Sequence, residues 1–323
     1  MYLAGYTFVG DDLIIGHGDF KYKVIVDWGN LDKLTTPVSD CHEMVQDSKG
    51  RIILLTNNTK NNVIIYNKDG KLIETWGNKY PGAHGLTIKN EGGEDFLYIT
   101  DTEKSFVVKT TLSGREIMKI NRPSEFDTAD NKLNFVPTET AIVENGDIYI
   151  ADGYGSQYIY IYDQNGRLKS RFGGPGKEDD QFYNCHGVAI DERSGIPRIL
   201  VTAREKNQLK YFTTSGVYES TIELPGAYIC RPVIHEENIF LATIWSGDKG
   251  DNTGFISILD KDNKLVSAPG GRVPQYEGSK LKKMTQAYQV FKHPHDVCVD
   301  DDENIYVPQW NAGQVYPMKL IRV

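Results

Sequence analysis

The chain has 323 residues, with 36 lysines and arginines against 44 aspartates and glutamates, so its formal net charge is −8. An acidic chain without a basic run is a poor match for nucleic acid, which we exclude as an expected partner. No apolar segment approaches the roughly 20 residues of a membrane-spanning helix, so we expect no membrane partner. Chains of this length can form two domains, but several all-β architectures of this size fold as one, and we expect a single domain over residues 1–323.

The first residues, Met1–Gly5, lack the basic and apolar regions of a signal peptide. We therefore expect the chain as given to be cytoplasmic. A secreted or periplasmic location is the alternative if a signal peptide has been removed.

A local pattern recurs along the chain with a histidine at the same point each time. Its four copies are Cys41-His42-Glu43-Met44, Ala83-His84-Gly85-Leu86, Cys185-His186-Gly187-Val188 and Pro294-His295-Asp296-Val297. Farther along the units, Asp69-Gly70 and Asn165-Gly166 stand between apolar runs, which is typical of hairpins because glycine adopts positive φ without steric cost. Each unit is therefore expected to be a four-stranded antiparallel meander.

Six units can be counted, at intervals of about 40 to 65 residues, the period of propeller blades. They begin near His42, His84, Thr138, His186, Cys230 and His295. The last unit reaches three strands before the chain ends, whereas Lys23–Gly29 resembles the fourth strands of other units. The sequence predicts an all-β, six-bladed propeller whose N-terminal strand closes the last blade and removes a free sheet edge. Residues 266–290 do not fit the repeat, and we expect an insertion there that is partly helical and acts as a lid.

The first strand of each propeller blade lines the central channel, so the four repeat histidines are expected to converge. The alternative is that each is a core histidine bonded to neighbouring backbone. Four of the seven histidines at one repeat position favour a metal site. Three imidazoles suit Zn²⁺ with an open fourth position, and four also suit iron, manganese or copper.

The four cysteines form no CxxC pair, and three of them lie within three residues of a repeat histidine. Buried free thiols are therefore expected rather than disulfides.

These motifs resemble the lyase domain of peptidylglycine α-amidating enzymes, within the six-bladed NHL-type propellers. The resemblance covers most of residues 40–323 and is strongest at three of the histidine motifs and over Val136–Tyr154. It implies zinc on His84, His186 and His295, an active-site tyrosine at Tyr154 and a substrate-binding arginine at Arg204. It also implies a structural Ca²⁺ held by Asp296 and the backbone carbonyls of Met44 and Leu86; the alternative is that Asp296 accepts a hydrogen bond from a neighbouring repeat turn.

Several positions depart from the family pattern. Asn57 stands where a second arginine is expected, and His293 replaces a methionine. His42 is an additional histidine, either a fourth ligand or a second acid/base. With Arg204, we list Asn57, His293 and Arg231 as substrate-binding candidates. The metal scaffold is expected to be retained and the substrate specificity changed.

The leading hypothesis is a metal-dependent lyase acting on a small polar substrate that bears a hydroxyl or carbonyl. Tyr154 is its acid/base and Arg204 binds an anionic group. Two structural alternatives stay open: Tyr154 packs among neighbouring tyrosines, and Arg204 pairs with Glu205 or Asp152. Two functional alternatives are a four-histidine metal oxygenase, distinguished by its metal and its need for O₂, and a non-enzymatic NHL-type propeller that binds a protein or glycan.

Overall fold

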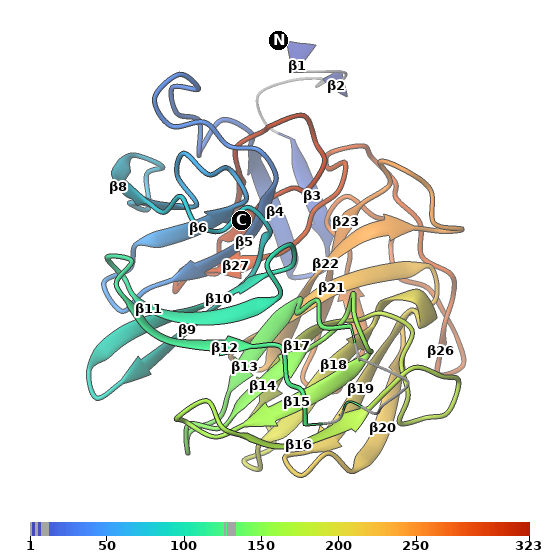
Figure 1. The fold of residues 1–323 in the computed structure, drawn as a ribbon. Helices are drawn as coiled ribbons and strands as arrows, with labels where there is room; N and C mark the ends of the chain where they lie inside the picture. Colours follow the sequence, from blue (N-terminus) through green and yellow to red (C-terminus); the bar gives the residue numbers. More distant parts are fainter. Residues whose placement is uncertain (1, 4–5, 8–12, 126, 128–133) are drawn as a thin grey trace.

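The computed structural model describes residues 2–3, 6–7, 13–125, 127 and 134–323. Six β-sheets of four or five strands surround a common centre (Figure 1). The predicted all-β, six-bladed propeller is therefore confirmed. Apart from the strands, the described residues contain one short 3-10 helix, η1 (Arg204–Lys206). No helix in this part of the chain is long and apolar enough to cross a membrane.

Blades 1 to 5 are antiparallel meanders in which the order of strands in the sheet follows the chain. Blade 1 contains β5 (Cys41–Gln46), β6 (Ile52–Thr56), β7 (Val63–Tyr66) and β8 (Leu72–Trp76). Blade 2 contains β9 (Ala83–Glu91), β10 (Glu94–Asp101), β11 (Phe106–Thr111) and β12 (Glu116–Asn121). Blade 3 contains β13 (Glu139–Ile142), β14 (Ile148–Ala151), β15 (Tyr158–Tyr162) and β16 (Leu168–Gly173). Blade 4 contains β17 (Cys185–Asp191), β18 (Arg198–Ala203), β19 (Gln208–Thr213) and β20 (Tyr218–Glu223), and blade 5 contains β21 (Ala227–His235), β22 (Asn238–Ser246), β23 (Phe255–Leu259) and β24 (Leu265–Ser267).

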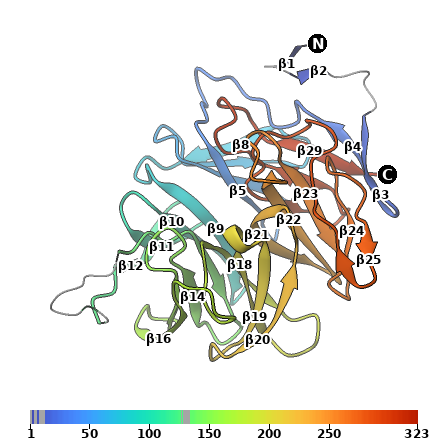
Figure 2. The same ribbon diagram turned by 90° about the vertical axis from the view of Figure 1, so that its right-hand side faces the viewer.

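Blade 6 joins the two ends of the chain. Its strands, in sheet order, are β27 (Cys298–Val299), β28 (Ile305–Val307), β29 (Met318–Arg322), β4 (Phe20–Ile25) and β3 (Ile14–His17). The N-terminal and C-terminal strands lie side by side in both views (Figures 1 and 2), and Val24 pairs with Leu320. The predicted closure is confirmed, with β3 as a fifth strand that was not predicted. A separate two-stranded sheet, β1 (Tyr2–Leu3) and β2 (Tyr6–Thr7), precedes it.

The core lies between the faces of neighbouring blades. Ile53 and Leu55 of blade 1, for example, pack with Leu86 and Ile99 of blade 2, and all four are almost fully buried. The strands β6 and β7 are buried along their whole length, whereas the outer strand β8 is mostly exposed. Apolar runs therefore mark the middle of each blade, and polar residues mark its rim.

The expected helical character of residues 266–290 is wrong. The segment begins with the end of β24 and then contains only the short hairpin of β25 (Tyr276–Glu277) and β26 (Lys280–Leu281). Pro269, Gly270, Gly271 and Pro274 follow each other too closely for a helix to form. Backbone hydrogen bonds fasten the segment to blade 5, one of them from Met284 to Pro225. The lid role stays a prediction.

Candidate metal centre

A β-bulge interrupts the innermost strand of several blades at the histidine position. The pairing register shifts between Cys41 and Glu43 in β5, and between Cys185 and Val188 in β17. Strands β9 and β21 carry equivalent shifts, at Ala83–Leu86 and at Ile229–Pro232. A bulge inserts an extra residue and re-aims its side chain. The alternation of an ordinary strand is thereby broken where a histidine must face the channel.

The glycine that follows two of the histidines permits close packing between blades. A Cβ atom on Gly85 would lie 2.4 Å from the carbonyl oxygen of Thr138 in the next blade, and one on Gly187 would lie 2.6 Å from the Cα atom of Arg231. Any larger residue would push neighbouring inner strands apart. The His-Gly pairs at 84–85 and 186–187 therefore combine a channel-facing side chain with a tight blade interface.

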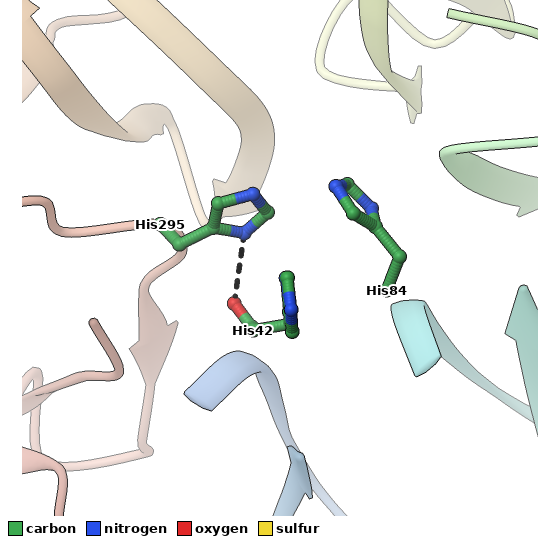
Figure 3. A group of neighbouring side chains, drawn as sticks. All are labelled: His42, His84 and His295. Atoms are coloured by element: carbon green, nitrogen blue, oxygen red, sulfur yellow. Dashed lines mark hydrogen bonds between the residues drawn. The ribbon is translucent and has the colours of Figure 1, made fainter. Parts of the chain in front are cut away.

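All four repeat histidines converge on the channel, as predicted. The ring centroids of His42 and His84 lie 4.9 Å apart, those of His84 and His186 4.9 Å, and those of His186 and His295 5.0 Å. None of the four residues is more than 6% exposed. Figure 3 shows three of the rings, from blades 1, 2 and 6, turned toward one another. Residues separated by as many as 253 positions thus form one cluster.

The hydrogen bonds of these imidazoles leave nitrogen atoms for a metal ion. Nδ1 of His84 contacts the carbonyl oxygen of Thr138 at 2.9 Å, and Nδ1 of His295 contacts that of His42 at 3.0 Å (Figure 3). When Nδ1–H donates to these carbonyls, Nε2 carries the lone pair, which in His84 faces the Tyr154 hydroxyl at 3.2 Å. This arrangement orients histidine ligands in metalloproteins. Nδ1 of His42 and Nδ1 of His186 are buried without a hydrogen-bond partner in the described part of the chain. Buried polar atoms rarely lack a hydrogen-bond partner, so these two nitrogens are candidates for an additional ligand.

The residues present therefore fit a transition-metal ion. Two sets place their ligand atoms within 4.8 Å of one another: His42, His84 and His295, and His186, Cys230 and His295. Cys230 takes the place of a histidine in blade 5, because β17 and β21 carry the same register shift and His186 and Cys230 hold the same position in it. A soft thiol beside imidazoles suits zinc.

Electrostatics keep the histidines in the form that binds metals. Burial lowers the pKa of His42 to about 4 and lowers the pKa of His84, His186 and His295 well below the ordinary value of 6.5. Neighbouring imidazoles and the Arg204 guanidinium lower the pKa of these three further. All four rings are consequently neutral at pH 7, and their lone pairs are available without loss of a proton.

Tyr154 reaches into the same cluster from the surface. Its hydroxyl lies 3.2 Å from Nε2 of His84 and 3.1 Å from Nε2 of His186, although the residue as a whole is 41% exposed. Desolvation raises the pKa of Tyr154, and the Arg204 guanidinium opposes that rise. The structure therefore places the predicted tyrosine against the imidazoles, so it does not merely pack among its neighbouring tyrosines.

Arg204 is a buried cation near this tyrosine. It is 2% exposed, and it donates to the carbonyl oxygen of Ile229 at 3.3 Å and to the Cys230 sulfur at 3.2 Å. The expected alternative pairing is wrong, because Glu205 pairs with Lys249 at 2.6 Å and Asp152 accepts hydrogen bonds from Val136 and Ser156. Within the described ranges, no carboxylate lies within ion-pair distance of Arg204.

The remaining substrate-binding candidates are held by partners. The Asn57 side chain exchanges two hydrogen bonds with Asp40, at 2.9 and 3.2 Å. The buried His293 lies 2.6 Å from the Asp251 carboxylate, with its ring 5.6 Å from that of Trp310. Substrate binding by Asn57 and His293 stays a prediction.

Two tryptophans that no sequence motif singled out lie beside these groups. The Trp245 ring centroid lies 6.3 Å from those of both His293 and Trp310, and 5.8 Å from the Arg204 guanidinium carbon. Trp310 follows the second strand of its blade by a few residues, as Tyr154 and Arg204 do in theirs. That shared position was the signal that would have found it.

The expected Ca²⁺ site does not fit this structure. The carbonyl oxygens of Met44 and Leu86 and both carboxylate oxygens of Asp296 accept hydrogen bonds from Arg231. The same contacts direct the Arg231 guanidinium into a buried network rather than toward a substrate. The cysteine prediction, in contrast, is confirmed, since all four are free and buried.

The amino-acid sequence is similar to several known proteins. No protein-family model matches the chain. Over 266 residues the chain is 31% identical to peptidyl-alpha-hydroxyglycine alpha-amidating lyase 1 of Drosophila melanogaster. The matched region covers 76% of this chain and 46% of that protein. Over 210 residues it is 22% identical to NHL repeat-containing protein 3 of Homo sapiens, with coverage of 59% and 56%. The chain resembles the amidating lyases within the six-bladed NHL-type propellers.

The match to these relatives extends over about half of their length. Among solved structures, a streptogramin B lyase superposes with a TM-score of 0.59 at 13% identity, covering 93% of this chain and 97% of the other. At that level of identity the similarity shows the propeller fold alone. Activity must therefore be argued from the site.

Proposed function

We propose that this chain is a metal-dependent, lyase-type enzyme that acts on a small polar substrate bearing a hydroxyl or carbonyl group. One observation carries the proposal: within a cluster of four buried imidazoles, two lie 3.2 and 3.1 Å from the Tyr154 hydroxyl, with Arg204 beside it. A structural cluster of core histidines would not require a phenol and a guanidinium at the same point. The similarity to an amidating lyase of Drosophila supports the same class of reaction.

By the family resemblance His84, His186 and His295 would hold the ion, with His42 as a fourth ligand or as a second acid/base. The two sets of ligand atoms within 4.8 Å of one another instead group His295 with His42 and His84, or with His186 and Cys230, so the ligand set is itself part of the proposal. A bound divalent ion such as Zn²⁺ supplies Lewis acidity, which lowers the pKa of a hydroxyl placed next to it. Tyr154 is then positioned to relay the hydroxyl proton, because its oxygen lies beside the ligand nitrogens. The raised pKa of Tyr154 keeps its hydroxyl protonated at neutral pH, which suits a proton donor to the leaving group.

Arg204 selects the substrate by charge. A buried guanidinium is costly unless an anion neutralises it, and its described neighbours supply a carbonyl, a thiol and the Tyr154 phenol but no carboxylate. A substrate carboxylate would complete the set and orient the reacting carbon toward Tyr154. Trp245 and Trp310 provide apolar surface next to this position. We therefore expect a substrate with an anionic group close to its hydroxyl and an apolar or peptide portion beyond it.

An α-hydroxyglycine peptide has this chemistry and serves as the first probe. Its hydroxyl loses a proton, the bond between the α-carbon and the amide nitrogen breaks, and that nitrogen takes up a proton. The products are glyoxylate and a peptide amide, and no oxidant is consumed. Because Asn57 replaces the expected second arginine, we expect weaker selection for the carboxylate than in the related lyases.

Metal analysis of the purified protein tests the proposal. About one transition-metal ion per chain should copurify, and alanine at His84, His186 or His295 should each lower its occupancy roughly tenfold or more, because a three-ligand site cannot spare one ligand. Alanine at the half-buried His235, on the rim of blade 5, is the matched control and should leave occupancy unchanged. Full activity in metal-free wild-type protein would refute a metal-dependent enzyme.

Tyr154→Phe separates binding from chemistry. The variant should keep the metal and lose turnover by roughly a hundredfold or more, since it lacks only the hydroxyl that transfers the proton. Glyoxylate release from the α-hydroxyglycine peptide is the measurement. A variant that retains both metal and rate would leave Tyr154 as a packing residue.

The four-histidine oxygenase is the second candidate, and the equal spacing of His42 with the other rings favours it. His42→Ala distinguishes the two enzymes. Loss of metal from His42→Ala, together with O₂ consumption by the wild type, supports the oxygenase. If His42→Ala keeps the metal but no longer releases glyoxylate, His42 is an acid/base. The non-enzymatic NHL-type propeller predicts that no variant of the ring changes the native role.

A further inference from the structure

The residues that follow the channel-facing ring form a second layer along the axis. The first layer consists of His42, His84, Thr138, His186, Cys230 and His295, one from each blade. The next residue in each blade is Glu43, Gly85, Glu139, Gly187, Arg231 and Asp296, respectively. This second layer contains three carboxylates, one guanidinium and two glycines. Its one cation therefore faces three acids from other blades.

Arg231 uses its donors on groups from three other blades. One terminal nitrogen, Nη1, lies 2.6 Å from the carbonyl oxygen of Leu86 in blade 2, and the other, Nη2, lies 3.2 Å from that of Met44 in blade 1. Nε and Nη2 contact the two oxygens of Asp296 at 3.1 and 2.7 Å. The side chain from blade 5 thus links strands that lie up to 187 residues away in the sequence.

The other two acids complete the surroundings of the guanidinium. Glu43 lies 3.4 Å from the Arg231 guanidinium and Glu139 lies 3.7 Å from it, and neither glutamate is more than 1% exposed. One Glu139 carboxylate oxygen, Oε2, has no hydrogen-bond partner among the residues that the structure describes. Buried carboxylates of like charge repel one another unless a cation lies between them. The two glycines of the layer add no further charge, and each lets its strand approach the next blade closely.

We propose that Arg231 is the built-in cation of the propeller axis, and that it holds the ring together through the carboxylates and carbonyls that would otherwise bind Ca²⁺. A planar guanidinium with five N–H donors can satisfy carboxylate and carbonyl oxygens in several directions at once, as a hard metal ion does. The axis is closed by a side chain, so its stability does not depend on calcium. This inference is independent of the proposed activity, which resides in the histidine layer.

A solvent ion can reach this position if the side chain is removed. Arg231 and Met44 line a cavity of about 410 Å³ that opens to solvent, together with Thr87, Val188 and Val297. Truncation of Arg231 would connect that cavity to three carboxylates and two carbonyl oxygens. Oxygen ligands of this kind and number are those that Ca²⁺ prefers.

Thermal melting of wild-type protein and Arg231→Ala, each with calcium removed and then with millimolar CaCl₂, tests the proposal. The wild-type melting temperature should not change between the two conditions. Arg231→Ala should melt roughly 5 to 10 °C lower without calcium, because it leaves buried carboxylates without a partner, and added Ca²⁺ should restore several degrees. The transition-metal content is followed in the same samples, so that loss of an ion from the histidine layer is not mistaken for an effect at Arg231.

Two further variants keep the test decisive. Arg204→Ala removes the other buried guanidinium, which has no carboxylate partner in the described ranges, and it should show no response to Ca²⁺. Arg231→Lys keeps the charge with fewer donors and should lose less stability than Arg231→Ala. If Arg231→Ala does not fold alone, its refolding yield with and without Ca²⁺ is the measurement. A calcium-dependent wild type, an alanine variant that Ca²⁺ does not help, or equal losses in the lysine and alanine variants would each overturn the proposal.

Discussion

At the scale of single residues, the protein buries four imidazoles in their neutral form, whereas in water a histidine gains a proton near pH 6.5. Their burial depresses each pKa, and two are anchored through Nδ1 to backbone carbonyls. A site of this kind is costly to bury without an ion, because two other imidazole nitrogens lack a partner in the described structure. The cost is consistent with a site built to receive a metal rather than to stabilise the fold.

This arrangement predicts how acid affects the metal-free protein. The pKa of His42 is about 4 when folded and 6.5 when unfolded, so between these values the unfolded chain binds the extra proton. The contribution of His42 to stability is therefore present above pH 6.5 and is lost as the pH falls toward 4. His42→Gln should reduce the acid-induced loss on the order of 1 to 3 kcal/mol over that window.

Denaturant unfolding of apo wild type and His42→Gln at pH 7 and 4.5 is the measurement. Burial raises the pKa of Asp296 to about 6, so this residue stabilises the folded protein as the pH falls through the same window. Because Asp296 is present in both proteins, its effect cancels in the difference. Identical pH dependence in the two proteins would show that His42 is not buried as a neutral ring.

At the scale of elements, turns and bulges place the side chains that the strands alone would misdirect. The turn between β7 and β8 contains Gly70, whose φ is +80°, and a Cβ atom there would lie 1.8 Å from the carbonyl oxygen of Trp28. Trp28 in turn donates to the carbonyl oxygen of Lys68 at 2.9 Å and packs against Tyr66 and Tyr306. The turn of blade 1 is thus fitted to the N-terminal segment.

Gly70→Ala should therefore destabilise the protein by roughly 2 kcal/mol or more beyond the cost of a positive φ, since the backbone of Trp28 must move. Gly278→Ala is the matched control, because Gly278 has a φ of +60° and a Cβ there meets no atom within 4 Å. It should cost about 1 kcal/mol. Chemical denaturation of both variants measures the difference, and equal losses would contradict the fitted turn.

At the scale of the whole molecule, closure of the ring depends on strands from both ends of the chain. β4 pairs with β29 along four residues and β3 covers β4 in turn, while Tyr22 and Leu320 are fully buried. Without the N-terminal strands, β29 would present an unpaired apolar edge.

Removal of residues 1–30 should consequently abolish most soluble, monomeric protein, because both β3 and β4 and the Trp28 contacts are lost. Size-exclusion chromatography and a thermal melt of any soluble fraction measure the effect. Recovery of a monomer with an unchanged melting temperature would show that blade 6 is stable with three strands.

Sequence periodicity was sufficient to predict the propeller, its six blades and the convergence of His42, His84, His186 and His295. These follow from a repeat of fixed length, because equivalent residues in a ring of equivalent blades must face the same axis. The free cysteines were predictable from composition and spacing. The fifth strand β3 depended on packing that no repeat encodes, whereas the prolines and glycines between Pro269 and Pro274 were a local signal against a helix after β24.

The roles of single charged residues were decided by tertiary structure. Arg204 follows the second strand of its blade and Arg231 lies within the innermost strand of the next, but neither position indicates a charge partner, and only Arg231 meets carboxylates. The aromatic neighbours Trp245 and Trp310 come from different blades, and no local pattern joins them. A repeat determines which position faces the channel, but the identity of the group opposite it depends on five other blades, and charge pairing across the axis is set by that three-dimensional neighbourhood.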